Sequence, residues 1–269
     1  MRALDFQTLD EPRILRSLRT QWIGRSLRIV DECGSTNDVA GKLAGEDAVR
    51  GLVVIAETQT AGRGRNGREW CSPRGGVWLS ILVRPHEHLS SMSVLPLVGA
   101  LGIAASLSEN WKVNARVRWP NDVMINKRKV AGVLVESKSK GNQLTYAVIG
   151  LGVNANCNTS KIESISNTAT ALFTILGERV NREDLICAIL LHIENFYESL
   201  SLSADRDILQ TLRSLDCSRG NHVKVKLTDR EVEGTFDDYS SLGEVRIMTA
   251  DGFESIRTEA VVSVDYQSN

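Results

Sequence analysis

One loop combines glycine and arginine in a pattern that suits an anionic ligand. Residues 59–70 read Gln-Thr-Ala-Gly-Arg-Gly-Arg-Asn-Gly-Arg-Glu-Trp and follow an apolar run, Leu52–Ala56. Glycine lets the backbone adopt unusual conformations and approach a ligand closely. Arginine presents a fixed fork of donors that matches carboxylate and phosphate groups. We therefore expect a mobile, cationic cover over an anionic ligand.

Two known nucleotide-binding motifs do not account for this loop. Gly62-x-Gly64-x-x-Gly67 has the spacing of the dinucleotide fingerprint, but that fingerprint must end a strand and open a helix. Residues 71–76, Cys-Ser-Pro-Arg-Gly-Gly, cannot start an amphipathic helix. The P-loop pattern also fails, because no Gly-Lys-Ser/Thr follows. The remaining alternative to a ligand cover is a solvated basic loop.

Other stretches place polar residues beside the ends of predicted elements. They are Gly-Ser-Thr-Asn at 34–37, Arg-Trp-Pro-Asn-Asp at 118–122, Lys-Val-Ala-Gly at 129–132 and Gly-Leu-Gly-Val-Asn at 150–154. Ser35 stands where a strand turns into a helix and is a suitable N-cap. Capping alone would explain Ser35 and Thr36, so this stretch is ambiguous by itself.

The elements that must position these residues alternate between helices and hairpin-like strands. Strands are predicted at 27–30, 77–83, 129–136 and 144–153, and helices at 12–22, 93–110 and 185–200, the last capped by Asn181. Beyond Asn221 the apolar period becomes two, as in a small all-β barrel with strands at 223–227, 231–236, 243–248 and 260–264. We expect an α+β fold with a mixed sheet, divided into domains 1–217 and 218–269.

Composition excludes several classes of protein. The 269 residues include 32 basic and 33 acidic side chains, a net charge of −1, which is no nucleic-acid footprint. The longest nearly apolar stretch, 94–107, is too short to span a membrane, and residues 1–5 begin no signal peptide. Five scattered cysteines indicate reduced thiols in a cytoplasmic protein.

In this order, the four stretches and the arginine loop closely resemble the biotin protein ligases (biotin–[acetyl-CoA-carboxylase] ligases). The arginine loop and the Trp-Pro-Asn-Asp…Lys-x-Ala-Gly block carry the resemblance, which extends from about Leu27 to the C-terminal barrel. It implies a mixed-sheet catalytic domain at 1–217 and an SH3-like β-barrel at 218–269. The short N-terminus looks like ligases without a winged-helix, DNA-binding domain, so no nucleic-acid partner is implied.

The resemblance also implies an activity. The family makes biotinyl-5′-AMP from biotin and Mg·ATP with release of pyrophosphate. It then transfers biotin to one lysine of a biotin carboxyl carrier domain, and its members are commonly homodimers. A lipoate or octanoyl ligase or transferase of the same fold is one alternative, which the complete Gly-Arg-Gly-Arg-x-Gly-Arg loop disfavours. A non-catalytic biotin-sensing module is another, and Lys129 with Asp122 argues against it.

By resemblance, the site residues fall into two groups. Those expected around biotin are Ser35, Thr36, Asn37, Gln59, Gly62, Arg63, Gly64, Arg65, Lys129 and Gly132. Those expected around ATP are Trp70, Arg118, Asn121, Asp122 and Asn154, with Asp122 holding Mg²⁺. Lys129, Arg65 and Asp122 are expected to be catalytic. The family usually has lysine where this chain has Arg118, and a planar fork does not replace an ammonium contact for contact.

The chemistry itself explains these residue types. A carboxylate that attacks a triphosphate brings two anions together, so catalysis needs fixed positive charge and alignment. Arg63, Arg65, Lys129 and a magnesium ion at Asp122 would supply the charge. Water destroys the mixed-anhydride product, so a closing loop is required. For the transfer step the base stays open between Asp122 and solvent.

Overall fold

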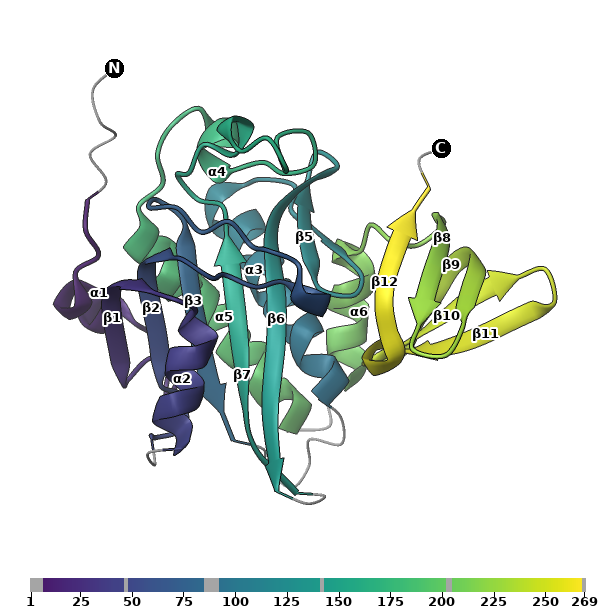
Figure 1. Ribbon diagram of the computed structural model, residues 1–269, viewed down its shortest axis with the longest axis horizontal. Coiled ribbons are helices and arrows are strands. Elements are labelled where there is room, and N and C mark those ends of the chain that lie inside the picture. The colour runs from purple at the N-terminus through teal and green to yellow at the C-terminus, as the bar shows by residue number, and fades with distance from the viewer. Residues whose placement is uncertain (1–6, 46–47, 85–91, 141–142, 202–204, 268–269) are drawn as a thin grey trace.

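The chain folds around two β-sheets of different size. The structure is a computed structural model that describes residues 7–45, 48–84, 92–140, 143–201 and 205–267. The larger sheet has seven strands in the order β1-β2-β3-β7-β6-β5-β4, and the smaller has five in the order β11-β10-β9-β8-β12. Both lie side by side along the long axis of the molecule (Figure 1). No helix in these ranges is long and apolar enough to cross a membrane.

The large sheet is mixed, as predicted. Its strands are β1 (Leu27–Cys33), β2 (Val53–Gln59), β3 (Val77–Val83), β4 (Arg116–Arg118), β5 (Asp122–Ile125), β6 (Arg128–Lys140) and β7 (Gln143–Val153). β1 and β2 are parallel, and the other described pairs are antiparallel. The α+β architecture expected from the alternation of elements is therefore confirmed.

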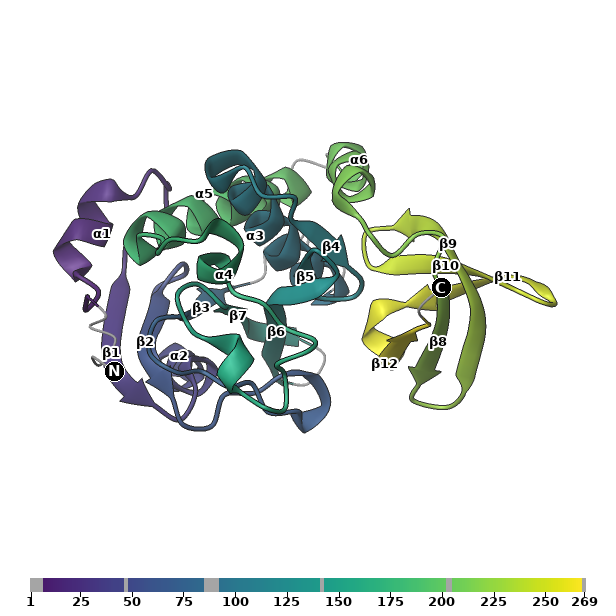
Figure 2. The same ribbon diagram turned by 90° about the horizontal axis from the view of Figure 1, so that it is seen from above.

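Helices cover both faces of the large sheet. They are α1 (Glu11–Ser17), α2 (Thr36–Gly45), α3 (Leu95–Trp111), α4 (Leu172–Leu176), α5 (Arg182–Ser201) and α6 (Asp205–Leu215). Short 3₁₀ segments are η1 (Arg65–Gly67), η2 (Met92–Val94), η3 (Thr159–Lys161) and η4 (Thr258–Ala260). Seen from above, α3 and α5 lie on one face of the sheet and α2 on the other (Figure 2).

The core lies between the sheet and these helices. All seven residues of β3 are buried, and so is most of α3. The helix predicted after Asn181 is confirmed as α5, and the Asn181 side chain accepts hydrogen bonds from the main-chain N–H groups of Glu183 (2.9 Å) and Asp184 (3.1 Å). These caps satisfy donors that a helix N-terminus leaves unpaired.

The helix predicted at 12–22 is shorter than expected. It ends at Ser17, and the chain then turns so that a buried carboxylate of α5, Glu194, accepts hydrogen bonds from the main-chain N–H groups of Gln21, Trp22 and Ile23. A distant acceptor thus replaces the carbonyls that a longer helix would have supplied. Sequence periodicity within 12–22 cannot detect a partner that lies about 170 residues away.

The C-terminal unit is all-β, as predicted, with one strand more than the sequence indicated. Its strands are β8 (His222–Leu227), β9 (Glu231–Ser241), β10 (Glu244–Thr249), β11 (Gly252–Arg257) and β12 (Val261–Tyr266). The additional strand, β11, pairs with β10 across a turn at Thr249–Gly252. Its sequence, Gly-Phe-Glu-Ser-Ile-Arg, lacks a clear apolar alternation. Main-chain pairing with β10, rather than an apolar pattern of its own, therefore stabilises β11 as a strand.

Trp119 forms the joint between the two units. Its ring packs edge-on against Phe236 at 5.7 Å between centroids, and its indole N–H donates to Thr258 Oγ1 (3.0 Å). The Tyr266 hydroxyl donates to the Trp119 carbonyl (2.7 Å). Just before the smaller sheet, the Cys217 N–H donates to the carbonyl of Val117 at the edge of the larger one (2.9 Å). We propose residues 217/218 as the domain boundary.

Candidate active site

A cavity of about 600 Å³ opens beside the arginine loop. It is lined by the turn before α2, the arginine loop, the segment 118–122, strands β6 and β7, residues 164–169 and strand β12. Every residue predicted for the site lines this cavity except Gly62. The arginine loop and the four other stretches singled out in the sequence therefore meet at one cavity.

The arginine loop is a hairpin rather than an open cover. The Trp70 N–H donates to the Gly62 carbonyl (2.9 Å), and the Gly64 N–H donates to the Arg68 carbonyl (2.7 Å). The tip is η1, where Asn66 adopts a left-handed conformation with φ of 57°. We call residues 62–70 the arginine hairpin.

Gly62 lies at the base of the hairpin and not on the cavity wall. A Cβ atom at this position would lie 2.4 Å from the Trp70 carbonyl oxygen and 2.7 Å from Ser72 Oγ. Such separations are far below van der Waals contact, so only glycine lets the two arms approach here. Gly62 thus acts through packing, and the structure shows no contact of its own with the cavity.

One end of the cavity, which we call the amide end, is formed by Thr36, Asn37 and Gln59. All three side chains are held by other protein groups. The Gln59 carbonyl oxygen accepts from the Thr36 N–H (2.8 Å), and its amide nitrogen donates to Ser72 Oγ (2.8 Å). The Asn37 amide nitrogen donates to Glu136 (2.7 Å). Their orientations are therefore fixed before any ligand binds.

Ser80 supports the amide end from inside the sheet, and sequence reasoning missed it. It lies in the middle of β3 and is fully buried. Its hydroxyl donates to Asn37 Oδ1 (2.6 Å) and lies 2.7 Å from Thr36 Oγ1. A serine within the otherwise apolar run Val77–Val83 was the available signal, because a buried hydroxyl needs a partner.

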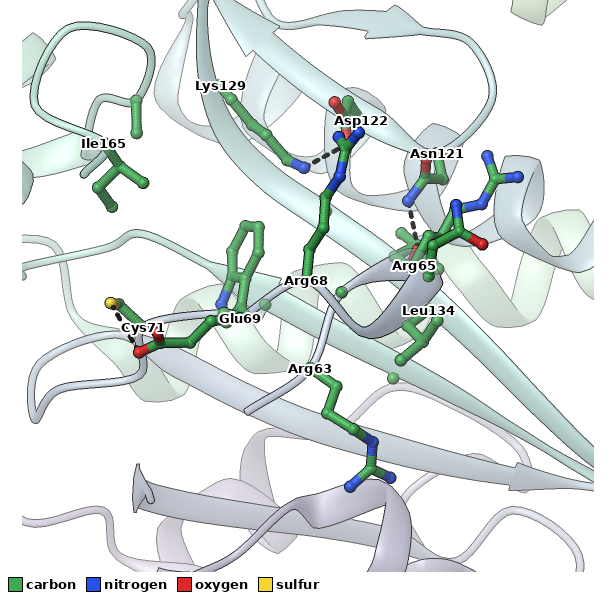
Figure 3. A pocket seen from close by; sticks show the side chains of 18 of the residues that line it. Arg63, Arg65, Arg68, Glu69, Cys71, Asn121, Asp122, Lys129, Leu134 and Ile165 are labelled. Atoms are coloured by element: carbon green, nitrogen blue, oxygen red, sulfur yellow. Dashed lines mark hydrogen bonds and ion pairs between the residues drawn. The ribbon is translucent and has the colours of Figure 1, made fainter. Parts of the chain in front are cut away.

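Arg63 was expected to face the anionic part of the ligand, but here it points away from it. Figure 3 shows its side chain directed toward α2, opposite to Lys129 and Asp122. The guanidinium donates to both oxygens of Asp38 (2.8 and 2.6 Å) and lies 3.3 Å from Glu136. Its hydrogen bonds lower the pKa of Asp38, and Asp38 in turn raises the pKa of Arg63. Arg63 anchors the hairpin in this conformation.

The opposite part of the cavity, which we call the cationic end, gathers Arg65, Arg68, Arg118 and Lys129 around Asp122. Lys129 Nζ lies 2.6 Å from Asp122 Oδ1, and Arg118 Nη2 lies 3.0 Å from Oδ2. The sequence predicted Lys129, Arg118 and Asp122 here. Both carboxylate oxygens are thus paired with a cation.

Two arginines of the hairpin complete the cationic end. Arg65 donates to the main-chain carbonyl of Val261 in β12. Burial lowers the pKa of Arg65, and the charge of Asp122 opposes that shift. Arg68 extends toward Asp122 (Figure 3). Arg68 was not among the predicted site residues, although it belongs to the same Gly-Arg repeat and its type alone was a sufficient signal.

Lys129 is positioned by a segment that sequence reasoning did not assign to the site. The Lys129 N–H donates to the Thr168 carbonyl (2.8 Å), and the Thr170 N–H donates to the Lys129 carbonyl (2.9 Å). Asn154, predicted as a nucleotide contact, donates through its side chain to the Thr170 carbonyl (3.1 Å) and is buried. In this structure Asn154 braces the segment that holds Lys129.

Trp70 lies across the floor of the cavity. A Cβ atom at Gly152 would lie 2.4 Å from the indole nitrogen, and one at Gly132 would lie 3.1 Å from the ring. Two glycines thus leave room for the indole on β6 and β7. Lys129 Nζ lies 5.0 Å from the ring centroid. The indole N–H is buried and, among the described residues, has no hydrogen-bond partner.

The donor set does not form a resident metal centre. Within the described ranges, no three or more His, Cys, Asp or Glu side chains come together to hold a metal ion. Asp122 stands beside Asn121, whose amide nitrogen donates to the Val133 carbonyl (2.7 Å). Since both Asp122 oxygens contact cations, a metal bound at this carboxylate would share it with Lys129 and Arg118 or displace one of them.

Comparison with known proteins agrees with this geometry. Residues 33–154 match the model of the biotin/lipoate A/B protein ligase family. The bifunctional ligase/repressor BirA of Bacillus subtilis is 32% identical over 230 residues, which cover 85% of this chain and 70% of that protein. The biotin–[acetyl-CoA-carboxylase] ligase of Mycobacterium tuberculosis is 30% identical over 253 residues, which cover 90% and 92%.

A solved structure supports the same assignment. The biotin protein ligase of Aquifex aeolicus in complex with biotin and ATP superposes with a TM-score of 0.80 at 28% identity, covering 90% of this chain and all of that one. The match extends into both sheets, because it spans nine tenths of the chain. The chain belongs to the biotin/lipoate A/B protein ligase family, and its named relatives are biotin ligases.

Proposed function

We propose that this protein is an ATP-dependent biotin–protein ligase. It condenses biotin with ATP to biotinyl-5′-AMP and pyrophosphate, and then transfers biotin to a lysine of a biotin carboxyl carrier domain. The observation that carries the proposal is a single cavity with an amide end of fixed, uncharged hydrogen-bonding groups and a cationic end around one carboxylate. Such a cavity suits a ligand with a neutral polar head and an anionic tail.

The amide end would hold the ureido ring of biotin. Ureido oxygen and nitrogen atoms need donors and acceptors at fixed positions, and the Gln59, Thr36 and Asn37 side chains offer both. Because the protein already orients these groups, little side-chain freedom is lost when the ligand binds. The valeryl chain would run over Trp70 and Gly132 toward Lys129, whose Nζ lies 5.0 Å from the Trp70 ring centroid.

The cationic end would carry out the adenylation step. The biotin carboxylate attacks the α-phosphorus of ATP, a P–O bond forms, and the bond to the β-phosphate oxygen breaks with pyrophosphate leaving. Lys129, Arg65 and Arg118 would bear on the oxygens where negative charge builds up. The ligand phosphates would replace Asp122 as the partner of Lys129 and Arg118.

Magnesium fits this end as part of the nucleotide substrate. Mg²⁺ prefers oxygen ligands and is usually held by one or two carboxylates together with phosphates. Asp122 would supply the protein ligand once Lys129 or Arg118 has shifted to the phosphates. When bound, the ion would neutralise phosphate charge.

In the transfer step, the acceptor amine would attack the acyl carbon of the adenylate and AMP would leave. The arginine hairpin would keep water from the mixed anhydride, since it forms part of the cavity wall. Relatives named as acetyl-CoA-carboxylase ligases make a carboxylase carrier domain the expected acceptor.

We expect a homodimer in the cytoplasm. Five free cysteines fit a reducing compartment, and burial raises the pKa of Cys157 to about 12.

The deciding experiment is pyrophosphate release from purified protein with ATP and biotin, run beside identical reactions with lipoate or octanoate. Release that needs biotin, followed by labelling of a carrier domain, supports the proposal. Release with lipoate instead would favour the alternative ligase activity, and biotin binding without release would favour a sensing module.

A further inference from the structure

The tip of the arginine hairpin contacts the C-terminal sheet. Arg65 donates to the Val261 carbonyl, and the Asn66 side-chain amide donates to the Val262 carbonyl. Both acceptors belong to β12, the strand at one edge of the smaller sheet. Strands at the edge of a sheet present main-chain carbonyls that have no partner in that sheet. The hairpin thus uses an edge that would otherwise face water.

Strand β12 is irregular at this contact. Its pairing with β8 runs from Val261↔Leu227 to Ser263↔Lys226, so the register shifts at Val262. A bulge of this kind leaves one residue out of the ladder and redirects its groups, and bulges are frequent next to active sites. The Val262 carbonyl, which accepts from Asn66, lies at that bulge. The strand is therefore shaped for an outside partner at this position.

The same strand is fastened to the catalytic unit at both of its ends. The Tyr266 hydroxyl donates to the Trp119 carbonyl (2.7 Å), and Thr258, just before β12, accepts from the Trp119 indole (3.0 Å). Trp119 stands next to Arg118 and three residues before Asp122. Strand β12 consequently links the tip of the hairpin to the segment that carries the cationic end. Four residues from Val262 to Tyr266 also line the cavity.

Asn66 has the chemistry that this contact needs. Its φ of 57° lies in the left-handed region, which asparagine tolerates better than most residues. Its carboxamide supplies an N–H donor to a carbonyl, which glycine and aspartate cannot. Asn66 directly follows Arg65, so a fixed main chain at Asn66 also fixes the point from which the Arg65 side chain extends. Asn66 thus combines a tolerated left-handed conformation with a side-chain N–H donor.

We propose that Asn66 is a positioning residue for the proposed ligase reaction: it latches the arginine hairpin to the bulge of β12, and so keeps Arg65 over the adenylate. This inference rests on the proposed function, because it names what the latched hairpin retains. The C-terminal sheet is then part of the cover of the active site. Loss of the latch lets the intermediate leave faster without removing any group that contacts it.

Two substitutions separate the latch from simple backbone strain. Asn66→Gly keeps the left-handed conformation and removes the donor. Asn66→Asp keeps the size but sets a carboxylate against main-chain carbonyls. One neutral hydrogen bond is worth a roughly 2- to 10-fold change in an equilibrium or release rate. We expect both variants to release biotinyl-5′-AMP roughly 2- to 10-fold faster than wild type, with Asn66→Asp at least as fast as Asn66→Gly.

The matched control is Asn126→Asp. Asn126 is exposed and also left-handed, with φ of 49°, but it lies in the turn between β5 and β6.

Release of biotinyl-5′-AMP is measured on the full chain after the adenylate has formed and excess biotin and ATP have been removed. Trypsin cleavage at Arg63, Arg65 and Arg68 without ligand gives a second readout. We expect the Asn66 variants to be cut faster there, and Asn126→Asp to match wild type in both measurements.

The outcomes are distinguishable. Wild-type protein that forms no adenylate would overturn the proposed function, while trypsin cleavage would still test the latch. Adenylate that leaves Asn66→Gly at the wild-type rate would overturn the latch and leave the proposed function intact. The latch is also wrong if Asn126→Asp gives the same acceleration, because the effect would then not depend on β12.

Discussion

The amide end and the cationic end of the cavity differ in how their polar groups are satisfied. At the amide end, Asn37 and Gln59 are held by several protein groups, which include the buried hydroxyl of Ser80 and the carboxylate of Glu136. At the cationic end, Lys129 and Arg118 share one carboxylate, Asp122, and stay partly exposed. A ligand at the amide end adds hydrogen bonds to those already present, whereas a ligand at the cationic end must displace the ion pairs with Asp122.

This difference separates recognition from reaction. A pre-oriented hydrogen-bonding surface binds a neutral group with little reorganisation, which favours affinity and selectivity. A cation held by a displaceable carboxylate can transfer to phosphate oxygens as charge develops there, which favours rate. Substitutions at the two ends should therefore alter different measurable quantities.

The largest expected effect is at Asp122. We expect Asp122→Ala to abolish adenylation, because Lys129 and Arg118 would lose the carboxylate that both contact and Mg²⁺ would lose the ligand proposed for it. Biotin affinity should stay near the wild-type value, since the amide end does not contact Asp122. Pyrophosphate release and calorimetric titration with biotin measure the two. Normal release by this variant at ordinary magnesium would refute the assignment.

Lys129 and Arg118 give the next contrast. Removing a preorganised charge stabiliser typically costs about 10²–10³ in rate, and we expect that loss for Lys129→Ala. Arg118→Ala should lose less, because its guanidinium also packs over the Tyr266 ring at 5.3 Å and so has a structural share. Single-turnover rates of adenylate formation decide the order. A larger defect for Arg118→Ala would reverse the two roles.

Ser80 tests the amide end. Ser80→Ala leaves Asn37 Oδ1 without its buried donor, a penalty of about 1–3 kcal/mol, part of which should appear as biotin affinity weakened by roughly 10-fold. The adenylation rate at saturating biotin should fall much less. Ser106 is the control: it is also fully buried, and its hydroxyl has no hydrogen-bond partner within the described ranges.

Ser106→Ala should leave biotin affinity at the wild-type value, because that hydroxyl lies on α3 and orients no other group. Titration of both variants with biotin makes the comparison. Equal affinities for Ser80→Ala and wild type would show that Asn37 keeps its orientation without Ser80. The amide end would then be less dependent on the sheet than its hydrogen bonds suggest.

Much of the site was predictable because its residues cluster in short stretches. The arginine loop, residues 118–122 and Lys129 carry their chemistry in local spacing, and all but Gly62 of the predicted set line the cavity. Apart from Arg68, the residues that were missed depend on partners distant in sequence. Ser80 supports Asn37 from 43 residues away, and Asn66 contacts Val262 across 196.

The fold shows the same limit. Periodicity located α3, α5, β6 and β7, because each has an extended apolar pattern of its own. It predicted a longer α1 than the structure has, because Glu194 of α5 accepts the hydrogen bonds of the main chain at Trp22. It also missed β11, which is stabilised by its pairing with β10. The contacts of Arg63 could not be predicted from the loop either, because its carboxylate partners Asp38 and Glu136 lie outside the loop.

The joint at Trp119 makes the protein a candidate for splitting into complementary fragments. A chain cut between 217 and 218 would leave the Trp119 ring without Phe236 and β12 without the arginine hairpin. Each fragment would expose the surface that the other one covers. Fragments joined to two interacting proteins should reassemble where those proteins meet, and biotin transfer would then report their encounter. Labelling by either fragment alone would show that the cut leaves an independent enzyme.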